Sequence, residues 1–208
     1  LVTSTYAGIT LRLGNGDGSI GAEVVINPTQ NADHVMLADN NGDGKLDLLI
    51  SDGGPLLELI GNGNGTFQSA ISYSALSGVS HSFNRADTDG DGFQDIVSVS
   101  KTGTVNSFRG AYGSTQDGYQ SGVTLDNLLG RVEAIVSADF DEDGNMDILT
   151  GASSSWGGFG GDTVLHLGNG DNTVADGTVI TGGTRILAAG DLNGDNHVDF
   201  VTNTNPGE

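Results

Sequence analysis

Aspartate recurs at four places in the chain with a spacing that suits the binding of a cation. The segments that begin at Asp39, Asp87, Asp139 and Asp191 each carry Asp at positions 1, 5 and 9 and Asp or Asn at position 3. Oxygen ligands at alternate positions of a tight loop converge on one point, and glycine at position 4, position 6 or both allows the tight backbone. A set of oxygen ligands without His or Cys selects a hard cation, and calcium suits such a cage best. The alternative, an acidic turn that binds nothing, is less favoured because the spacing occurs four times.

The EF-hand is excluded as the source of this pattern. An EF-hand loop ends with a bidentate Glu at position 12 and lies between two helices. Position 12 in the four segments is Ile50, Ser98, Thr150 or Thr202. The apolar runs beside the loops have the length and composition of strands. We therefore expect the aspartate loops to join β-strands.

A second motif, Gly-Asn-Gly, alternates with the aspartate loops. It occurs at 14–16, 61–63 and 168–170, and a degenerate form occurs at 108–110. Such a motif between apolar stretches favours a hairpin turn. Each unit therefore reads as strand, aspartate loop, strand, linker, strand, turn, strand, and no segment has a sustained helical period. The first aspartates of the loops lie 48, 52 and 52 residues apart, which is the length of a four-stranded propeller blade.

The sequence therefore predicts an all-β fold, a β-propeller of four antiparallel blades in a single domain, residues 1–208. In this arrangement the strand Thr10–Leu13 pairs with Phe200–Asn203 and closes the ring, which removes exposed sheet edges. The alternative is that the chain is a fragment of a larger propeller. The predicted blades span residues 31–75, 79–127, 131–181 and, from the two ends of the chain, 184–208 together with 1–27.

The chain resembles the FG-GAP repeat family, also described as VCBS-type repeats, whose blades bind calcium in integrin α-chain propellers and in many secreted bacterial proteins. The aspartate loops are the specific part of this resemblance, which covers nearly the whole chain. The resemblance implies one calcium ion in each loop, four in all, with a carbonyl ligand at position 7. Two residues depart from the family pattern, because Glu142 at position 4 and Asn196 at position 6 replace glycine. The implied side-chain ligands are Asp39, Asn41, Asp43, Asp47, Asp87, Asp89, Asp91, Asp95, Asp139, Asp141, Asp143, Asp147, Asp191, Asn193, Asp195 and Asp199, and the implied carbonyl ligands are Lys45, Phe93, Asn145 and His197.

The charge of the chain limits its partners. The 27 acidic and 7 basic residues give a net charge of −20, which repels nucleic-acid phosphates and anionic membranes. Neither nucleic-acid binding nor membrane insertion is expected, and no apolar run is long enough to span a bilayer. The absence of cysteine excludes disulfides and thiolate sites. The chain begins at Leu1, as a trimmed chain would, and its composition indicates an extracellular protein, secreted or held at a cell surface.

Catalytic motifs are missing from the sequence. The histidines, His34, His81, His166 and His197, lie in different repeats, and there is no nucleophile elbow and no phosphate-binding loop. We therefore expect that the protein is not an enzyme.

Trp156 and Phe159 are the candidate ligand-binding residues. They lie in a Gly/Ser-rich linker, 153–161, between the second and third strands of the third repeat. An exposed aromatic side chain on such a loop could stack on a sugar or anchor a partner. The alternative is that the ring folds back over the edge of a blade.

The expected function is that of a calcium-stabilised adhesion or recognition module outside the cell. Its partner would be an extracellular protein or a glycan, and carbohydrate is the candidate ligand. Two alternatives stay open. The first is a structural subunit that self-assembles into an extracellular fibre or surface layer, and the second is an accessory propeller of a secreted polysaccharide-degrading enzyme.

We predict that the loops beginning at Asp87 and Asp139 bind calcium more tightly than the loops that contain Asn41 and Asn193. More ligand charge raises the affinity for calcium when the rigidity of the site is similar. Site-resolved calcium titration of variants with a single altered loop measures the difference. Tighter binding by the asparagine-containing loops would contradict the argument from charge.

Overall fold

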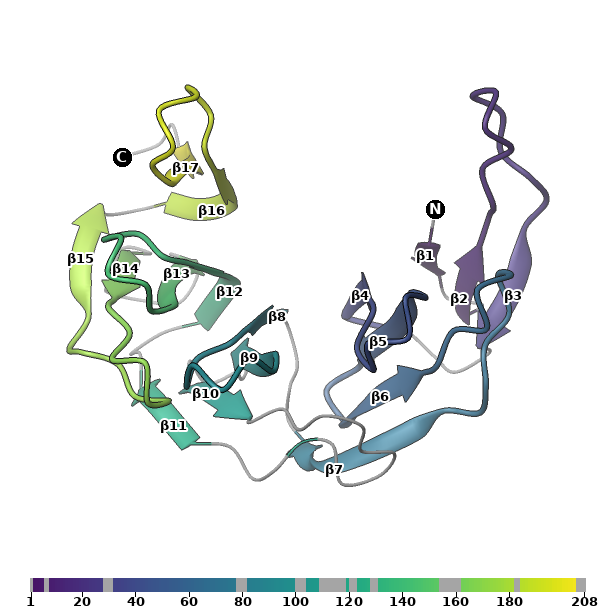
Figure 1. Ribbon diagram of the computed structural model, residues 1–208, viewed down its shortest axis with the longest axis horizontal. Coiled ribbons are helices and arrows are strands. Elements are labelled where there is room, and N and C mark those ends of the chain that lie inside the picture. The colour runs from purple at the N-terminus through teal and green to yellow at the C-terminus, as the bar shows by residue number, and fades with distance from the viewer. Residues whose placement is uncertain are drawn as a thin grey trace. The chain divides into compact units, whose positions relative to one another are not determined.

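A computed structural model of the chain shows an all-β fold, as the sequence predicts (Figure 1). Among the described residues there is no helix, and hence none that is long and apolar enough to cross a membrane. The chain divides into two compact units, Leu1–Ser80 with Gly113–Asp117 and His81–Tyr112 with Gly118–Glu208. The structure describes residues 2–5, 8–27, 32–77, 82–99, 104–108, 119, 123–127, 131–153, 162–181 and 184–204.

The first unit contains two antiparallel sheets. The first of them has three strands in the order β1-β2-β3, and the second has four strands in the order β4-β5-β6-β7. The strands are β1 (Val2–Thr5), β2 (Gly8–Leu11), β3 (Val24–Asn27), β4 (His34–Ala38), β5 (Asp47–Ser51), β6 (Pro55–Leu59) and β7 (Ile71–Ser77).

The second unit contains two four-stranded sheets and one two-stranded sheet, all antiparallel. The first strands of the three sheets, β8, β12 and β16, contact one another in succession. The strands are β8 (Ser82–Ala86), β9 (Asp95–Val99), β10 (Thr104–Phe108), β11 (Val123–Asn127), β12 (Arg131–Ala138), β13 (Asp147–Ser153), β14 (Thr163–His166), β15 (Thr178–Thr181), β16 (Thr184–Gly190) and β17 (Asp199–Thr204).

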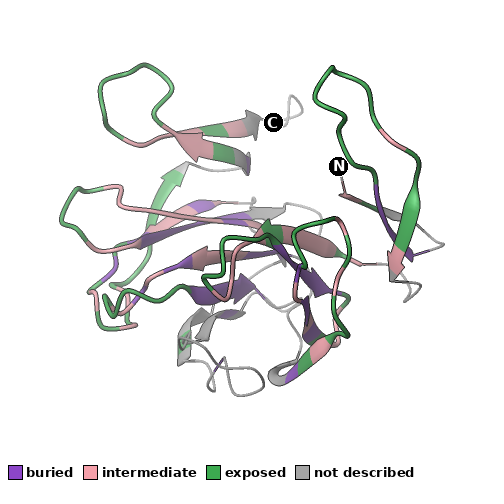
Figure 2. Cartoon of the chain, turned by 45° about the vertical axis from the view of Figure 1, so that its right-hand side comes forward, coloured by how far each residue is buried: buried purple, intermediate pink, exposed green. Residues whose placement is uncertain are grey.

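Each unit has its own apolar core between neighbouring sheets. In the first unit Ile9 of β2 packs with Leu48, Ile50 and Leu59 of the four-stranded sheet. In the second unit residues of β8, β9 and β10 pack with Val132, Ile135 and Ile148. All five residues of β5 and of β9 are buried, and Figure 2 shows exposed residues gathered on the loops. The strands β5 and β9 are therefore covered on both faces, which fits their mostly apolar sequences.

In the sheets β4–β7 and β12–β15 an aspartate loop and a Gly-Asn-Gly turn lie at the same end. An aspartate loop joins the first two strands and a turn joins the last two, as in the path β4–β5 and β6–β7. Because the strands are antiparallel, the connection between the second and third strands lies at the other end. Each of these turns therefore contacts the aspartate loop of its own sheet, as Gly168 contacts Met146.

The strand β1 is an additional strand that the sequence does not predict. Its residues, Val-Thr-Ser-Thr, contain a single apolar side chain, which is too weak a pattern to indicate a strand. Thr10 of β2 pairs with Thr3 of β1 on one edge and with Val25 of β3 on the other. No edge of β2 is left for another strand, so the predicted pairing of Thr10–Leu13 with Phe200–Asn203 is wrong. The number of blades and the composite blade stay predictions.

The first glycine of a turn packs against the backbone of the aspartate loop in the same sheet. A Cβ atom at Gly61 would lie 2.0 Å from the carbonyl oxygen of Leu46, and a Cβ atom at Gly168 would lie 2.2 Å from that of Met146. At Gly14, the matching glycine of the three-stranded sheet, a Cβ atom would have no described atom within 4 Å. At Gly61 and Gly168, therefore, the neighbouring loop backbone leaves no room for a side chain.

We predict that Gly61→Ala and Gly168→Ala lower the free energy of unfolding by about 1–3 kcal/mol or more, because backbone must move to make room for the methyl group. The control is Gly14→Ala, which should change it by less than about 0.5 kcal/mol. Urea unfolding of the three variants measures these values. Equal effects at all three glycines would refute the contact argument.

Candidate metal sites

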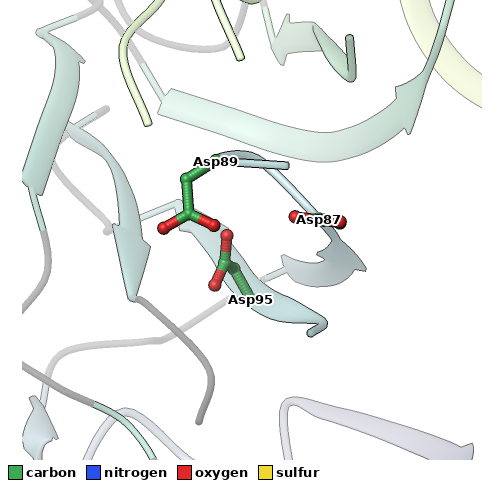
Figure 3. Close-up of side chains that lie close together, drawn as sticks. All are labelled: Asp87, Asp89 and Asp95. Carbon is green, nitrogen blue, oxygen red and sulfur yellow. The ribbon is translucent and has the colours of Figure 1, made fainter. Parts of the chain in front are cut away.

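Two aspartate loops bring three carboxylates together. We number the loops by order in the chain: loop 1 (39–47), loop 2 (87–95), loop 3 (139–147) and loop 4 (191–199). In loop 2 one oxygen from each of Asp87, Asp89 and Asp95 lies within 4.8 Å of the others. Figure 3 shows that the carboxylates of Asp89 and Asp95 face one another. The residues Asp139, Asp141 and Asp147 form the matching cluster in loop 3.

The aspartate at position 1 organises the backbone of each loop. In loop 3 the Oδ1 atom of Asp139 accepts a hydrogen bond from the N–H of Asp143 at 3.1 Å, and its Oδ2 atom accepts one from Gly144 at 3.0 Å. Loops 1 and 2 repeat both bonds. Position 6 has a positive φ in all four loops, including 69° at Asn196. Asparagine tolerates this conformation better than most residues, so the departure from glycine keeps the loop shape.

Asp191, at position 1 of loop 4, accepts several backbone hydrogen bonds. Its carboxylate accepts bonds from the N–H groups of Asn193, Gly194, Asp195 and Asn196 in loop 4. The bonds from Asn196 and Gly194 hold the pKa of Asp191 below its usual value. The loop therefore stabilises an ionised carboxylate at the position where a cation ligand is expected.

The aspartate at position 9 joins the loop to the turn. Asp147 is fully buried, and its Oδ2 atom accepts a hydrogen bond from the N–H of Phe140 at 2.7 Å. Its Oδ1 atom accepts one from the N–H of Gly168 at 2.8 Å. Burial raises the pKa of Asp147, while these backbone bonds oppose the rise and the charge of Asp141 adds to it. A cation in the cluster would favour the ionised form of this buried carboxylate.

The same bridge occurs in loop 1. There Asp47 is buried and accepts bonds from the N–H groups of Asn40, at 3.0 Å, and Gly61, at 2.8 Å. In loops 2 and 4 the position-9 carboxylates accept the corresponding bonds from Thr88 and Leu192, each at 3.0 Å.

The aspartate at position 5 lies outside the two carboxylate clusters. Its Oδ1 atom accepts a hydrogen bond from the N–H of position 7 in every loop, at 2.8–2.9 Å. In loop 1 Asp43 also pairs with the ammonium of Lys45 at 3.0 Å, which lowers the pKa of Asp43. In loops 2 and 3, therefore, the carboxylates at positions 1, 3 and 9 lie close together. Among the described residues the structure forms no cluster of three carboxylates in loops 1 and 4, where position 3 is Asn41 or Asn193.

Glu58 supports loop 1 and is not among the site residues predicted from the sequence. The buried carboxylate of Glu58, on β6, accepts a hydrogen bond from the side chain of Asn40 at 2.6 Å and another from the hydroxyl of Tyr73. Asn40 also donates its N–H to Asp47, so Glu58 stabilises loop 1 through its hydrogen bond to the side chain of Asn40. A single glutamate within the apolar strand Pro55–Leu59 is the signal in the sequence that indicates such a role.

The glutamate that replaces glycine in loop 3 reaches the next loop. Glu142 has a φ of 63°, and its carboxylate contacts the Nδ1 atom of His197 in loop 4. This contact raises the pKa of His197. The two loops are therefore linked through the exposed side chains of Glu142 and His197.

The predicted carbohydrate-binding residues Trp156 and Phe159 lie outside the described residues.

We predict that Asp147→Asn lowers the free energy of unfolding by about 1–3 kcal/mol even in a chelator, because an amide has one acceptor oxygen for two buried N–H donors. The matched control is Asp143→Asn, an exposed position-5 change that leaves those donors satisfied. Chemical unfolding in chelator separates this structural effect from loss of a cation ligand. An equal loss of stability in both variants would argue against the bridge.

Comparison with known proteins places the chain among repeat proteins. No curated protein sequence matches it. A similar solved structure is that of an Agrocybe aegerita lectin, described as specifically recognising non-reducing terminal N-acetylglucosamine. The two chains share 20% identity with a TM-score of 0.65 over 97% of this chain, which spans 56% of the lectin chain. That likeness shows a shared fold. The family model for FG-GAP-like repeats matches residues 39–98 and 87–150, and the chain therefore belongs to this repeat family.

Proposed function

We propose that the protein is a non-enzymatic carbohydrate-recognition module outside the cell, folded as blades of a propeller and stabilised by calcium. The observation that carries the calcium part is the convergence of three carboxylates in loop 2 and again in loop 3. The contacts between the first strands of successive sheets support a radial arrangement of blades.

The residues present fit a calcium ion. Positions 1, 3, 5 and 9 offer oxygen atoms alone, and Asp87, Asp89 and Asp95 already lie together. Fourteen of the 27 acidic residues are side-chain ligands of this kind, so a metal-free chain carries strong repulsion within each loop. Calcium would supply positive charge there, and binding to the folded state alone would stabilise it.

The proposed glycan ligand rests on the likeness to the lectin. The lectin's printed description names a terminal N-acetylglucosamine as its ligand, and this chain spans little more than half of the lectin's length. Terminal N-acetylglucosamine is therefore the first sugar to test. Trp156 and Phe159 are the proposed stacking residues, because aromatic rings bind the apolar faces of sugars.

We predict that chelation lowers the melting temperature by about 10 °C or more. A site held at a hundredfold excess over its Kd stabilises by about 2.7 kcal/mol, and 1 kcal/mol shifts the melting temperature of a chain of this size by about 2–4 °C. Calcium in two loops is therefore enough to account for a shift of this size in the melting temperature. Calorimetry over a calcium series should show saturation at about 10⁻⁴–10⁻³ M, with magnesium as the control ion. Superimposable melts with and without calcium would exclude the calcium proposal.

We predict that the calcium-loaded protein binds glycans that end in N-acetylglucosamine and is released by the free sugar. A glycan array with the whole chain measures the preference. The matched variants are Trp156→Ala and Phe159→Ala, which should lose binding while they keep the calcium-dependent melt. Absence of binding to every glycan, with the melt intact, would remove the recognition proposal and leave calcium binding in place.

A further inference from the structure

We propose that Asn172, in the turn of one sheet, is a positioning residue for the metal ligands of loop 2 in the preceding sheet. It acts through Thr88, which lies between Asn172 and the position-9 carboxylate of Asp95. The inference rests on the proposed calcium binding and deepens it. It implies that calcium binding at loop 2 and the docking of the β12–β15 sheet on the β8–β11 sheet strengthen one another.

Thr88 and Asn172 are joined by two contacts across the boundary between the sheets. The N–H of Asn172 donates to the carbonyl oxygen of Thr88 at 3.0 Å. The Oγ1 atom of Thr88 also lies 3.0 Å from the side-chain oxygen of Asn172. Thr88 is buried, with 6% of its surface exposed. The residue at position 2 of loop 2 is thus fixed by a turn that lies 84 residues away in the sequence.

Thr88 passes this constraint to a metal ligand. Its N–H donates to the Oδ2 atom of Asp95 at 3.0 Å, and its hydroxyl contacts the same oxygen. One hydroxyl proton serves one acceptor, and a carboxylate is the stronger acceptor. The hydroxyl of Thr88 lies between the Oδ2 atom of Asp95 and the side-chain oxygen of Asn172, and it connects the two residues.

The contact with Thr88 explains why position 172 is asparagine and not glycine. The other two turns of the same motif carry glycine at the matching place, Gly18 and Gly65, with φ values of 89° and 83°. Asn172 takes the same left-handed conformation, with a φ of 65°, although glycine adopts it at lower cost. Among these three turns, this is the one that the structure shows hydrogen-bonded to an aspartate loop of a neighbouring sheet.

Orientation of Asp95 matters for the affinity of loop 2. Asp95 is fully buried and belongs to the cluster with Asp87 and Asp89. Groups that hydrogen-bond to a metal ligand fix its orientation before the metal binds, and their loss commonly reduces metal affinity about 10- to 100-fold. Because such coupling is reciprocal, an ion bound by Asp95 should also favour the Thr88–Asn172 contact.

Loop 3 shows the same arrangement with different chemistry. Its position-2 residue, Phe140, donates its N–H to Asp147 and places its ring edge-on to the ring of Phe200 on β17, with centroids 6.4 Å apart. In both loops the residue next to the first aspartate contacts the position-9 carboxylate and the following sheet. An aromatic pair in place of an amide and a hydroxyl gives the same link between sheets.

The test is a calcium titration of the ¹⁵N-labelled chain followed by NMR. The amide of Gly92, which donates to Asp87 at 2.9 Å, reports loop 2, and that of Gly144, which donates to Asp139, reports loop 3. We expect Asn172→Gly to raise the Kd measured at Gly92 about tenfold and to leave the Kd at Gly144 unchanged. Glycine retains the turn conformation and the backbone N–H, so the change removes the side chain alone.

Two further comparisons separate positioning from general stability. Thr88→Val should weaken loop 2 as Asn172→Gly does, whereas Thr88→Ser keeps the hydroxyl and should retain the affinity. The matched control is Asn169→Ala in the same turn, whose side chain bonds Thr173 at 2.8 Å and which should leave Gly92 unchanged. The rise in melting temperature caused by calcium should also be smaller in Asn172→Gly than in the unaltered chain.

The outcomes are distinguishable. If calcium shifts neither Gly92 nor Gly144 in the unaltered chain, the proposed calcium binding fails. If calcium binds but Asn172→Gly and Thr88→Val keep the original Kd at Gly92, the positioning role is overturned. Equal losses at Gly92 and Gly144 would also overturn it, because they would show a general loss of stability.

Discussion

The buried carboxylate at position 9 connects three parts of the sheets β4–β7 and β12–β15. In loop 3 its two oxygens accept the N–H groups of Phe140 and Gly168, while the residue itself begins the second strand. The loop, the strand and the turn are thereby held by one side chain. The same residue is a proposed cation ligand. Fold and site share this group, and a change at position 9 must affect both.

Donor groups of the protein hold the aspartates of each loop in place. Backbone N–H groups bond the carboxylates at positions 1, 5 and 9, and in loop 1 the ammonium of Lys45 pairs with Asp43. In loop 3 the amide of Asn145 bonds the matching oxygen of Asp143 at 3.0 Å. The residue at position 7 thus contacts the position-5 carboxylate through its backbone N–H and, in loops 1 and 3, through its side chain as well.

Regular spacing made much of the fold predictable from sequence. The aspartate loops, the Gly-Asn-Gly turns and the strands between them follow from residue types that repeat, and the all-β fold and the repeat family are confirmed. What does not repeat was not predictable. Position 2 is Asn40, Thr88 or Phe140 in the first three loops, and each contacts a different partner. The polar strand β1 also lacks an alternating pattern, and its pairing with β2 determines which edges remain for other strands.

The close packing of turn glycine on loop backbone has a consequence for how such repeats can be rearranged. Because Gly61 and Gly168 each lie against the backbone of the aspartate loop in the same sheet, any exchanged turn must keep glycine at this place. The link from Asn172 to Thr88 adds a second rule, since it matches one sheet to the sheet before it. Shuffled or transplanted sheets would keep their internal fit and lose this match. The order of the sheets β8–β11 and β12–β15 is thus encoded in their side chains as well as in the chain that joins them.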